Sequence, residues 1–328
     1  MPRAAGRRWP TPWPKSAAWV SNPGSPMAIE ALRQLRTARL HLHYADSGPA
    51  DGPVAVLLHG WPDSILGWSD LVAALNAAGW RTLVPFLRGF GPNRFLAPDT
   101  PRSGQACAIA ADVEALADGL DIERFALIGH DWGARASYAL AALRSERIER
   151  LVALSVGHAP PAPLGLRQAQ NYWYHWYFAL PRGEAALRED PRALCRHLWQ
   201  SWSPGWAFPD SLFEAAAQAF DNPDWIAVTL HSYRQRWGFA AGDPAHATWE
   251  GRLAQGLPIP VPTLVLHGAD DRCNDPSTSA DASLFVGRYR RLLLPGVGHF
   301  PQREAPETVS AAVLDWLGTP GQAGNRAL

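Results

Sequence analysis

The strongest constraint on the fold is a regular exchange of short apolar runs with longer segments of helical periodicity, which starts near residue 31. Short apolar or alternating runs are typical of strands, whereas apolar residues spaced three and four apart mark one face of a helix. The expected strands are "RLHLHY", "VAVLLHG", "RTLVPFL", "FALIGH", "RLVALSV", "PTLVLHG" and "YRRLLLPG". The expected helices lie around "GWSDLVAALNAAGW" and "QACAIAADVEALADGL", directly after "FALIGH", and over "PETVSAAVLDWL". Strands that alternate with helices predict an α/β protein with a mostly parallel sheet and helices on both faces.

The alternation stops near residue 159 and resumes near residue 257, so residues 30–158 and 257–322 are predicted to form one core. Residues 159–256 have the pattern of helices punctuated by proline and are expected to form a helical cap. This insert contains eight of the sixteen tryptophans, namely Trp173, Trp176, Trp199, Trp202, Trp206, Trp225, Trp237 and Trp249. An aromatic cap over a sheet edge would enclose a dry pocket for a small hydrophobic molecule. Most of these tryptophans are also expected to build the core of the insert itself.

Residues 1–29 form a separate, proline-rich arm with several basic side chains. The arm lacks the apolar stretch of a secretory signal, and its prolines disfavour regular helix or sheet. It is therefore expected to lie extended on the surface or to be disordered. Met27 precedes the first regular pattern, so translation from Met27 instead of Met1 is an alternative hypothesis.

The overall charge excludes some classes of partner. Thirty basic residues balance thirty acidic ones in the 328-residue chain, which favours neither nucleic acid nor an anionic membrane surface. No apolar run approaches the roughly 18 to 20 residues that span a bilayer. The three cysteines lie far apart without a CxxC pair, and a cytoplasmic protein with reduced thiols is expected.

The segment "GHDWG" places Asp131 between a predicted strand and a predicted helix. A Gly-X-nucleophile-X-Gly turn at such a junction is the nucleophile elbow, in which small residues allow a sharp turn that projects one side chain. Gly129 and Gly133 match the two glycines. The turn by itself leaves a second interpretation open, because Asp is also a common N-cap of helices.

Two further segments favour the nucleophile. "LLHGWPDS" ends an earlier strand, where hydrolases of this architecture supply one backbone N–H of an oxyanion hole. That donor is predicted to be Trp61, and the second is the N–H of Trp132, the residue after Asp131. "LPGVGHFPQREAPETV" places His299 after a predicted strand and before a helix, where a catalytic base is expected.

A catalytic histidine needs a carboxylate that fixes its tautomer and stabilises the imidazolium. The segment "LVLHGADDRCND" offers three acidic residues after another strand. Asp271 is the preferred choice because it stands three residues after Gly268, and Asp270 is the alternative. Turn-capping by these acids and a solvated His299 are the competing interpretations, but nucleophile, acid and base occur together in this order.

These motifs resemble one known family. From about residue 30 to residue 317 the chain is similar to α/β-hydrolase-fold proteins of the epoxide hydrolase family, through "HGWPDS", "GHDWG", "GADD" and "GVGHF". The resemblance implies Asp131 as nucleophile, Asp271 as acid and His299 as base. A carboxylate can displace a leaving group at saturated carbon, and the resulting ester is then hydrolysed by water that the histidine activates. The implied reaction opens a small hydrophobic epoxide to a vicinal diol without metal or organic cofactor.

The same resemblance implies two cap tyrosines as acids for the epoxide oxygen. "HSYRQRW" suggests Tyr233 for one, and "NYWYHWYF" suggests Tyr174 for the other, with Tyr172 and Tyr177 as rivals. Residues predicted to line the substrate pocket are His59, Pro62, His175, Trp176 and Phe300.

Two other functions are compatible with parts of the pattern. Haloalkane and haloacetate dehalogenases share the Asp nucleophile, and Trp132 could offer its indole N–H to a halide, although Trp61 stands where haloalkane dehalogenases usually have Asn. Haloacetate enzymes carry Arg one and four residues after the nucleophile. In those enzymes the two arginines bind the substrate carboxylate. Only Arg135 matches here, because Trp132 stands at the first position, so a carboxylate substrate is disfavoured and Arg135 is expected to form a surface ion pair instead. A ligand-binding protein without turnover is the third hypothesis, and a monomer and a homodimer are both compatible with the sequence.

Overall fold

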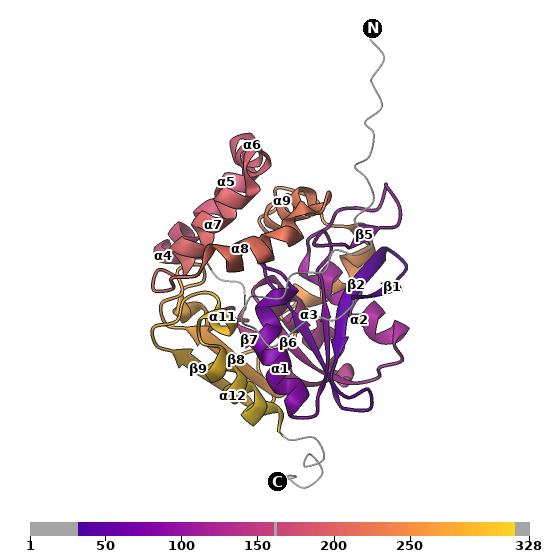
Figure 1. The fold of residues 1–328 in the computed structure, drawn as a ribbon. Helices are drawn as coiled ribbons and strands as arrows, with labels where there is room; N and C mark the ends of the chain where they lie inside the picture. Colours follow the sequence, from indigo (N-terminus) through magenta and orange to yellow (C-terminus); the bar gives the residue numbers. More distant parts are fainter. Residues whose placement is uncertain (1–31, 161–162, 319–328) are drawn as a thin grey trace.

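A nine-stranded, mostly parallel sheet forms the centre of the molecule (Figure 1). The structure is a computed structural model that describes residues 32–160 and 163–318. The strand order is β1-β2-β4-β3-β6-β7-β8-β9, with β5 paired to β2. Strands β3, β4, β6, β7, β8 and β9 run parallel to their neighbours in this group, and β2 is antiparallel to β4. The strands are β1 (Arg33–Arg36), β2 (Leu40–Ser47), β3 (Val54–Leu58), β4 (Arg81–Pro85), β5 (Arg94–Phe95), β6 (Phe125–His130), β7 (Ile148–Leu154), β8 (Thr263–Gly268) and β9 (Tyr289–Leu294).

The burial of each strand follows from its place in the sheet. Strands β6 and β8 each lie between two parallel neighbours, and every residue of both is buried, as expected for parallel strands covered on two faces. Strand β2 alternates buried apolar residues such as Leu40 and Leu42 with partly exposed histidines, because one of its faces is only partly covered. The predicted mostly parallel sheet is confirmed.

Helices cover the sheet in two layers. Helix α1 (Ser69–Ala77) packs with α12 (Pro306–Leu317), and α2 (Ala106–Gly119) packs with α3 (Trp132–Leu143). The helices after "FALIGH" and over "PETVSAAVLDWL" thus form as predicted. A short helix α11 (Pro301–Glu304) precedes α12.

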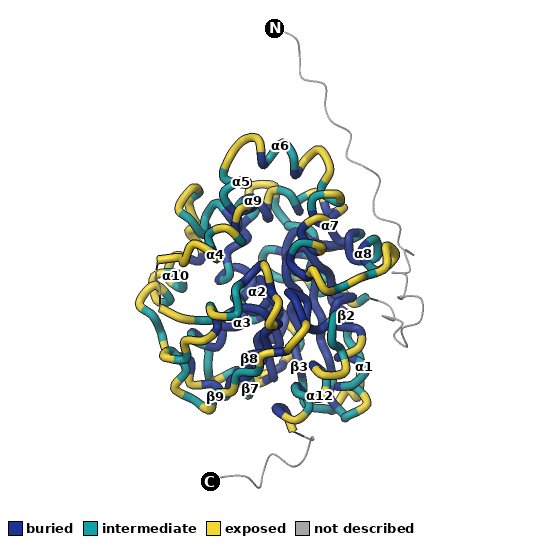
Figure 2. The backbone as a smooth tube through the Cα atoms, turned by 90° about the vertical axis from the view of Figure 1, so that its left-hand side faces the viewer, coloured by how far each residue is buried: buried dark blue, intermediate teal, exposed yellow. Residues whose placement is uncertain are grey.

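A group of helices from residues 166–236 lies over one end of the sheet, as Figure 1 shows. They are α4 (Leu166–Asn171), α5 (Trp173–Ala179), α6 (Pro181–Glu189), α7 (Pro191–Trp202), α8 (Asp210–Ala217) and α9 (Trp225–Arg236). In Figure 2, α6 forms the exposed outer rim, whereas the interior between these helices and the sheet is buried. Helix α10 (Ala247–Leu253) contacts α3 of the core. The boundaries 159 and 256 for a cap stay a prediction.

Strands β1 and β5 were not expected from the sequence. Both are short and partly exposed, with the sequences "RQLR" and "RF", so neither contains an apolar run that would identify it. They extend the sheet only through pairing with β2. The arm of residues 1–29 lies outside the described residues.

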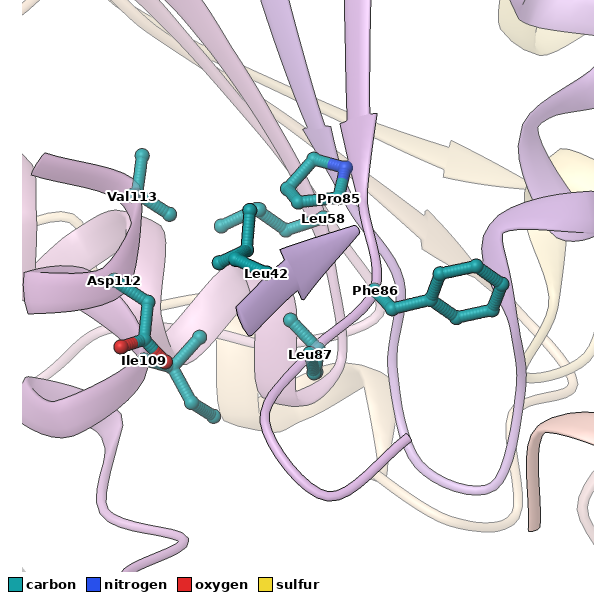
Figure 3. A pocket seen from close by; sticks show the side chains of 8 residues that line it. All are labelled: Leu42, Leu58, Pro85, Phe86, Leu87, Ile109, Asp112 and Val113. Carbon is teal, nitrogen blue, oxygen red and sulfur yellow. The ribbon is translucent and has the colours of Figure 1, made fainter. Parts of the chain in front are cut away.

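A small cavity lies beside strands β2 and β4 and helix α2 (Figure 3). Its volume is about 10 Å³, and it is lined by Leu42, Leu58, Pro85, Phe86, Leu87, Ile109, Asp112 and Val113. A space of this size holds at most about one water molecule. It includes none of the predicted site residues and is a packing defect of the core. Across residues 32–160 and 163–318, no helix has the length and apolar character needed to cross a membrane.

Candidate active site

The predicted nucleophile lies at the tip of a turn between β6 and α3. Asp131 has a φ of 49°, a left-handed conformation that is rare for residues other than glycine, and it is 6% exposed. Its side chain makes no capping hydrogen bond to α3, although it occupies the N-cap position. The carboxylate therefore projects from the elbow, and the helix-cap interpretation of Asp131 is not supported.

The glycines around Asp131 are required by close contacts. A Cβ on Gly133 would lie 2.2 Å from the carbonyl oxygen of Leu58, and one on Gly129 would lie 2.5 Å from the carbonyl carbon of Gly133. A Cβ on Gly60 would lie 2.6 Å from the Cβ of Asp131. The motifs "GHDWG" and "HGWP" thus allow two chain segments to meet at the nucleophile.

The first predicted oxyanion donor contacts the carboxylate directly. The backbone N–H of Trp61 donates to Oδ1 of Asp131 at 3.0 Å. The other oxygen, Oδ2, faces His299. The two carboxylate oxygens therefore have different surroundings. The role of the Trp132 N–H as second donor stays a prediction.

The predicted base and acid form a buried pair next to this carboxylate. His299 Nδ1 lies 2.9 Å from Oδ2 of Asp271, and Nε2 lies 3.9 Å from Oδ2 of Asp131. The second distance is too long for a hydrogen bond, and Nε2 has no hydrogen-bond partner among the described residues. Asp270 is exposed, so Asp271 is the carboxylate that contacts His299.

Asp271 is held as a carboxylate by several donors. Oδ1 accepts hydrogen bonds from the backbone N–H groups of Cys273 and Asn274 at 2.7 and 3.0 Å, and Oδ2 lies 3.3 Å from Nε2 of His267. Burial alone would raise the pKa of Asp271, but the charge and hydrogen bonding of His299 and His267 lower it to about 2. Burial likewise opposes a charge on His299, yet the Asp271 carboxylate raises the pKa of His299 well above its usual value.

A second layer of polar groups positions the loop of His299. The backbone N–H of His299 donates to Ser203 Oγ at 2.8 Å, and this hydroxyl donates to Glu304 at 2.6 Å. The Glu304 carboxylate also accepts from the N–H groups of Gly298 and Phe300. These groups were not identified from the sequence, because partners 96 and 101 residues apart leave no local pattern.

The two predicted tyrosine acids lie next to each other above Trp61. The Tyr174 ring stacks on Trp61 at 5.8 Å, and the Tyr233 ring meets Trp61 edge-on at 5.2 Å. The two tyrosine rings are 5.3 Å apart, and burial raises the pKa of both phenols well above the usual value. Both therefore remain protonated donors near neutral pH.

The rival tyrosines are placed differently. The Tyr172 hydroxyl donates to Asn274 at 2.6 Å and accepts from Arg135 at 3.1 Å, so its hydrogen-bonding capacity is used. Tyr177 is partly exposed and packs beside Trp173. Tyr174 instead contacts the Cys273 sulfur at 3.4 Å, close to the acid. The geometry favours Tyr174 over both rivals.

The rings around Trp61 form a continuous aromatic cluster, which we call the Trp61 cluster. Its members are Trp61, Trp132, Tyr174, Phe178, Trp202, Trp225 and Tyr233. The Trp61 indole N–H donates to Thr229 on α9 at 3.0 Å, and the Trp202 ring lies 5.1 Å from His299. Residues of the core and of the insert thus share one aromatic wall beside Asp131, Asp271 and His299.

Three of the five predicted pocket residues lie in the core, and the other two lie on α5. Phe300 is fully buried, with its ring 5.1 Å from His299, and the Pro62 carbonyl accepts from the Trp199 indole at 2.9 Å. His59 bonds backbone groups through both ring nitrogens, and burial lowers the pKa of His59 to about 4.

The remaining two lie on α5. The ring of His175 is 4.5 Å from that of Tyr233, and its Nδ1 accepts from the Trp237 indole at 3.1 Å. Trp176 donates to the Ala169 carbonyl at 3.0 Å and packs on Trp237. The structure thus brings His175 to the Trp61 cluster, whereas Trp176 packs behind it.

Arg135 does not form the surface ion pair that the sequence analysis predicts. Its side chain is partly buried on α3, and Nη2 donates to the Tyr172 hydroxyl at 3.1 Å. Within the described ranges it has no carboxylate partner, and its Nε has no hydrogen-bond partner. The prediction is wrong because this face of α3 lines a pocket together with residues of α9 and α10, and none of them pairs with Arg135.

Other polar contacts near the site were also missed. His130 Nε2 contacts the His299 carbonyl at 2.7 Å, and Arg303 forms a buried ion pair with Asp63 at 2.6 Å. His130 lies inside the motif "GHDWG", and Asp63 lies inside "HGWPDS". Their positions in these motifs were the sequence feature that could have identified them. In the part of the chain that is described, no group of three or more His, Cys, Asp or Glu side chains is arranged to hold a metal ion.

Comparison with known proteins shows which family the chain resembles. The family with the alpha/beta hydrolase fold matches residues 53–306. Epoxide hydrolase A of Mycobacterium tuberculosis is 30% identical over 321 residues, covering 89% of this chain and 98% of that protein. Epoxide hydrolase 3 of Siraitia grosvenorii is 37% identical over 311 residues, covering 86% and 96%. A crystal structure from Klebsiella pneumoniae, provisionally described as an epoxide hydrolase, is 40% identical with a TM-score of 0.85 over 88% of this chain and 98% of its own.

An elbow between a buried parallel strand and a helix, facing a histidine from the last strand–helix connection, is the arrangement of an α/β-hydrolase-fold enzyme, and the family match covers it. This chain is a hydrolase of that fold. Because relatives with 30% and 37% identity align over nearly their whole length, it belongs to the epoxide hydrolase family.

Proposed function

We propose that this enzyme opens an epoxide to a vicinal diol through a covalent ester on Asp131. The observation that carries the proposal is the unequal environment of the Asp131 carboxylate. Oδ1 already accepts from the Trp61 N–H at 3.0 Å, whereas Oδ2 is the oxygen nearest His299. A carboxylate held by one oxygen at a backbone donor presents the other as nucleophile.

In the first step, Oδ2 of Asp131 attacks an epoxide carbon and the bond from that carbon to the epoxide oxygen breaks. The oxygen would leave as an alkoxide, which is a poor leaving group without a proton donor. Tyr233 and Tyr174, whose raised pKa keeps them protonated, are the proposed donors. The products are an alkyl ester and a neighbouring hydroxyl group.

In the second step, water attacks the carbonyl carbon of the ester while His299 Nε2 takes its proton. Asp271 stabilises the imidazolium through the 2.9 Å contact to Nδ1. The negative charge develops on Oδ1, which the Trp61 N–H already binds and which the Trp132 N–H is proposed to bind as well. Collapse of this intermediate releases the diol, and His299 returns the proton to the departing oxygen. Asp131 is left as a carboxylic acid, and loss of its proton to the tyrosinate formed in the first step restores both groups.

Helices α4 to α9 are proposed to act as the cap of this site, within the boundaries 159 and 256. They contribute both tyrosines, Trp202 and Trp225 to the Trp61 cluster. A wall of this composition suits a small hydrophobic epoxide and excludes bulk water from the reacting groups.

The covalent mechanism is tested by a single turnover in ¹⁸O-labelled water, with enzyme in excess over styrene oxide. The first diol should be unlabelled, because its new oxygen comes from Asp131, and label should enter the diol only in later turnovers. Label in the first diol would show direct attack by water and defeat the proposal.

The ester is tested directly by intact mass. His299→Gln should accumulate a species heavier by the mass of one substrate molecule, since ester formation does not need the base. Asp131→Ala should show no adduct. His197→Gln, an exposed histidine on α7, is the matched control and should turn over without accumulation.

One observation keeps a dehalogenase as the second candidate. The Trp132 indole is buried beside Tyr233, with the two rings 5.5 Å apart, and a halide could accept from its N–H. Parallel assays with an epoxide and with the matching 1-chloroalkane separate the two functions. Diol formation that depends on Tyr233 supports the epoxide reaction, whereas faster chloride release that survives Tyr233→Phe supports dehalogenation.

A ligand-binding protein without turnover is the remaining alternative. Such a protein would bind an epoxide equally well with and without His299. The parallel assays with the epoxide and the 1-chloroalkane would then detect no product.

A further inference from the structure

A second cavity of about 330 Å³ lies between three helices of the enzyme. Its wall uses one face of α3, with Arg135, Tyr138 and Ala139, and one face of α9, with Ser232, Gln235 and Arg236. In both helices these positions are spaced by three and four residues, which places them on one side. Residues on α10 close the cavity. Its volume suits a small organic molecule.

The two arginines on this wall have no ion-pair partner within residues 32–160 and 163–318. Arg135 donates only to the Tyr172 hydroxyl, and Arg236 lies 5.6 Å over the ring of Tyr233. By contrast, Arg234 on the same helix forms an ion pair with Glu184 at 2.8 Å. Two partly buried cations that face one cavity without an ion-pair partner are costly unless an anion joins them.

Further polar atoms in the same cavity lack partners. Among the described residues, Arg135 Nε and His158 Nε2 are buried and make no hydrogen bond. Burial, and then Arg135, lower the pKa of His158 to about 4, so its ring is neutral and can donate one N–H. Burial and the neighbouring Arg135 also lower the pKa of Arg236. The cavity therefore combines like charges with unused donors.

We propose that this cavity binds the carboxylate of an organic acid between Arg135 and Arg236. The planar guanidinium groups match a carboxylate through paired N–H donors. The carboxylate has two possible sources. In the first, which rests on the proposed function, it is the acidic end of the epoxide substrate. In the other source, it belongs to a separate acid that binds beside the active site.

The position of the arginines relates the cavity to the reacting groups. Arg135 follows Asp131 by four residues on α3, and Arg236 follows Tyr233 by three residues on α9. One helical turn is about 5.4 Å, so each cation lies roughly one turn from a proposed catalytic group. Tyr172, which contacts Arg135, also stacks on His175 beside Tyr233.

Glu250 on α10 is the one carboxylate among the residues that line the cavity. It accepts from the Gln105 amide at 3.0 Å and forms no ion pair with either arginine within the described ranges. Its charge opposes an incoming anion at longer range. Removal of this charge is therefore a gain-of-binding test that leaves both arginines in place.

Binding is measured first, without turnover, by calorimetry with sodium butyrate and with butyramide as the uncharged analogue at matched ionic strength. The wild-type enzyme should bind butyrate and not butyramide. Arg135→Gln and Arg236→Gln should each weaken butyrate binding by about tenfold or more, since each removes a charge-assisted hydrogen bond. Arg234→Gln is the matched control on α9 and should bind as the wild type does. Glu250→Gln should tighten binding several-fold, and this variant decides the matter if an arginine variant does not fold.

Kinetic assays with two substrates, 4,5-epoxypentanoate and 4,5-epoxypentanamide, distinguish the two sources of the carboxylate. Hydrolysis of the amide by the wild-type enzyme tests the epoxide activity independently of the cavity. If the carboxylate belongs to the substrate, the ratio of kcat/KM for acid over amide should fall about tenfold or more in Arg236→Gln. If only butyrate binding falls, the site takes a separate acid.

Either pattern supports the carboxylate site. The proposal is overturned if butyrate binds no better than butyramide, or if Arg135→Gln and Arg236→Gln bind it as tightly as Arg234→Gln does. An unchanged affinity in Glu250→Gln would count against it as well.

Discussion

Ser203, at the end of α7, connects the insert to the loop that carries the proposed base. Its hydroxyl accepts the backbone N–H of His299 at 2.8 Å and donates to Glu304 at 2.6 Å. The substitution Ser203→Ala removes both bonds and leaves a buried N–H without its acceptor. We expect it to act on the position of His299 and not on the nucleophile.

The size of the effect follows from the lost contacts. A hydrogen bond to a charged group contributes about 1.5–3 kcal/mol, so the free energy of unfolding should fall by about 2 kcal/mol. Unfolding entropy is about 2.1 cal/mol/K per residue, so in a chain of 328 residues each kcal/mol shifts the Tm by about 1.5 °C, and the Tm should fall by about 3 °C. A displacement of the imidazole by about 1 Å should slow ester hydrolysis by roughly 10- to 100-fold.

The assay separates the two chemical steps. Rapid quench followed by intact mass gives the rate of ester formation and the rate of its hydrolysis in one experiment. In Ser203→Ala, the ester should accumulate because only hydrolysis needs His299. Ser201→Ala is the control on the same helix, since its hydroxyl bonds only the Leu198 carbonyl at 3.0 Å.

Two results would refute this reasoning. Equal slowing of both steps would show a general disturbance of the site and not a displaced base. Unchanged hydrolysis with a lower Tm would show that Ser203 stabilises the fold without positioning His299.

Three further predictions concern other parts of the site. Tyr233→Phe should slow ester formation by roughly 100-fold or more while Tyr177→Phe changes little, because only the first phenol faces Trp61, and equal rates by rapid quench would contradict this. Since Asp271 raises the pKa of His299, neutral base accumulates as pH rises, and the rate of ester hydrolysis should increase with pH. In Asp271→Asn this rise should move to lower pH and the maximal rate should fall, as single-turnover pH profiles can show. The pKa of Asp271 is about 2 in the folded protein, below the usual value of ~3.9. The stabilisation that its carboxylate provides is therefore complete above pH ~3.9 and is lost as the pH falls towards 2. Acid unfolding of Asp271→Asn should therefore depend less on pH below about 4, and an unchanged profile would contradict the linkage.

Much of the core was predictable because its signals are local. An apolar run followed by "GHDWG" predicts both the buried strand β6 and the turn that carries Asp131, since neighbouring residues determine both features. The same holds for His299 and Asp271, which follow strands and so must meet at one edge of the sheet. Strand β5, with only two residues, has no such pattern.

The contacts that were missed depend on residues far apart in the chain. The Arg135 side chain is adjacent to α9 and α10, which begin about a hundred residues later, so its neighbours were not visible from "GHDWGARAS". Its misassignment shows that a charged residue on a predicted amphipathic helix need not face solvent. Ser203 and Glu304 are also distant in sequence, and their partnership requires the fold.

Trp61 performs two tasks with separable parts. Its main chain binds Asp131, whereas its indole ring is the centre of the aromatic wall. Any residue except proline can provide a main-chain N–H. A change of side chain at position 61 would thus alter the aromatic wall and keep the main-chain N–H that is proposed to stabilise the oxyanion. This position is therefore one at which substrate range could diverge while the proposed reaction is retained.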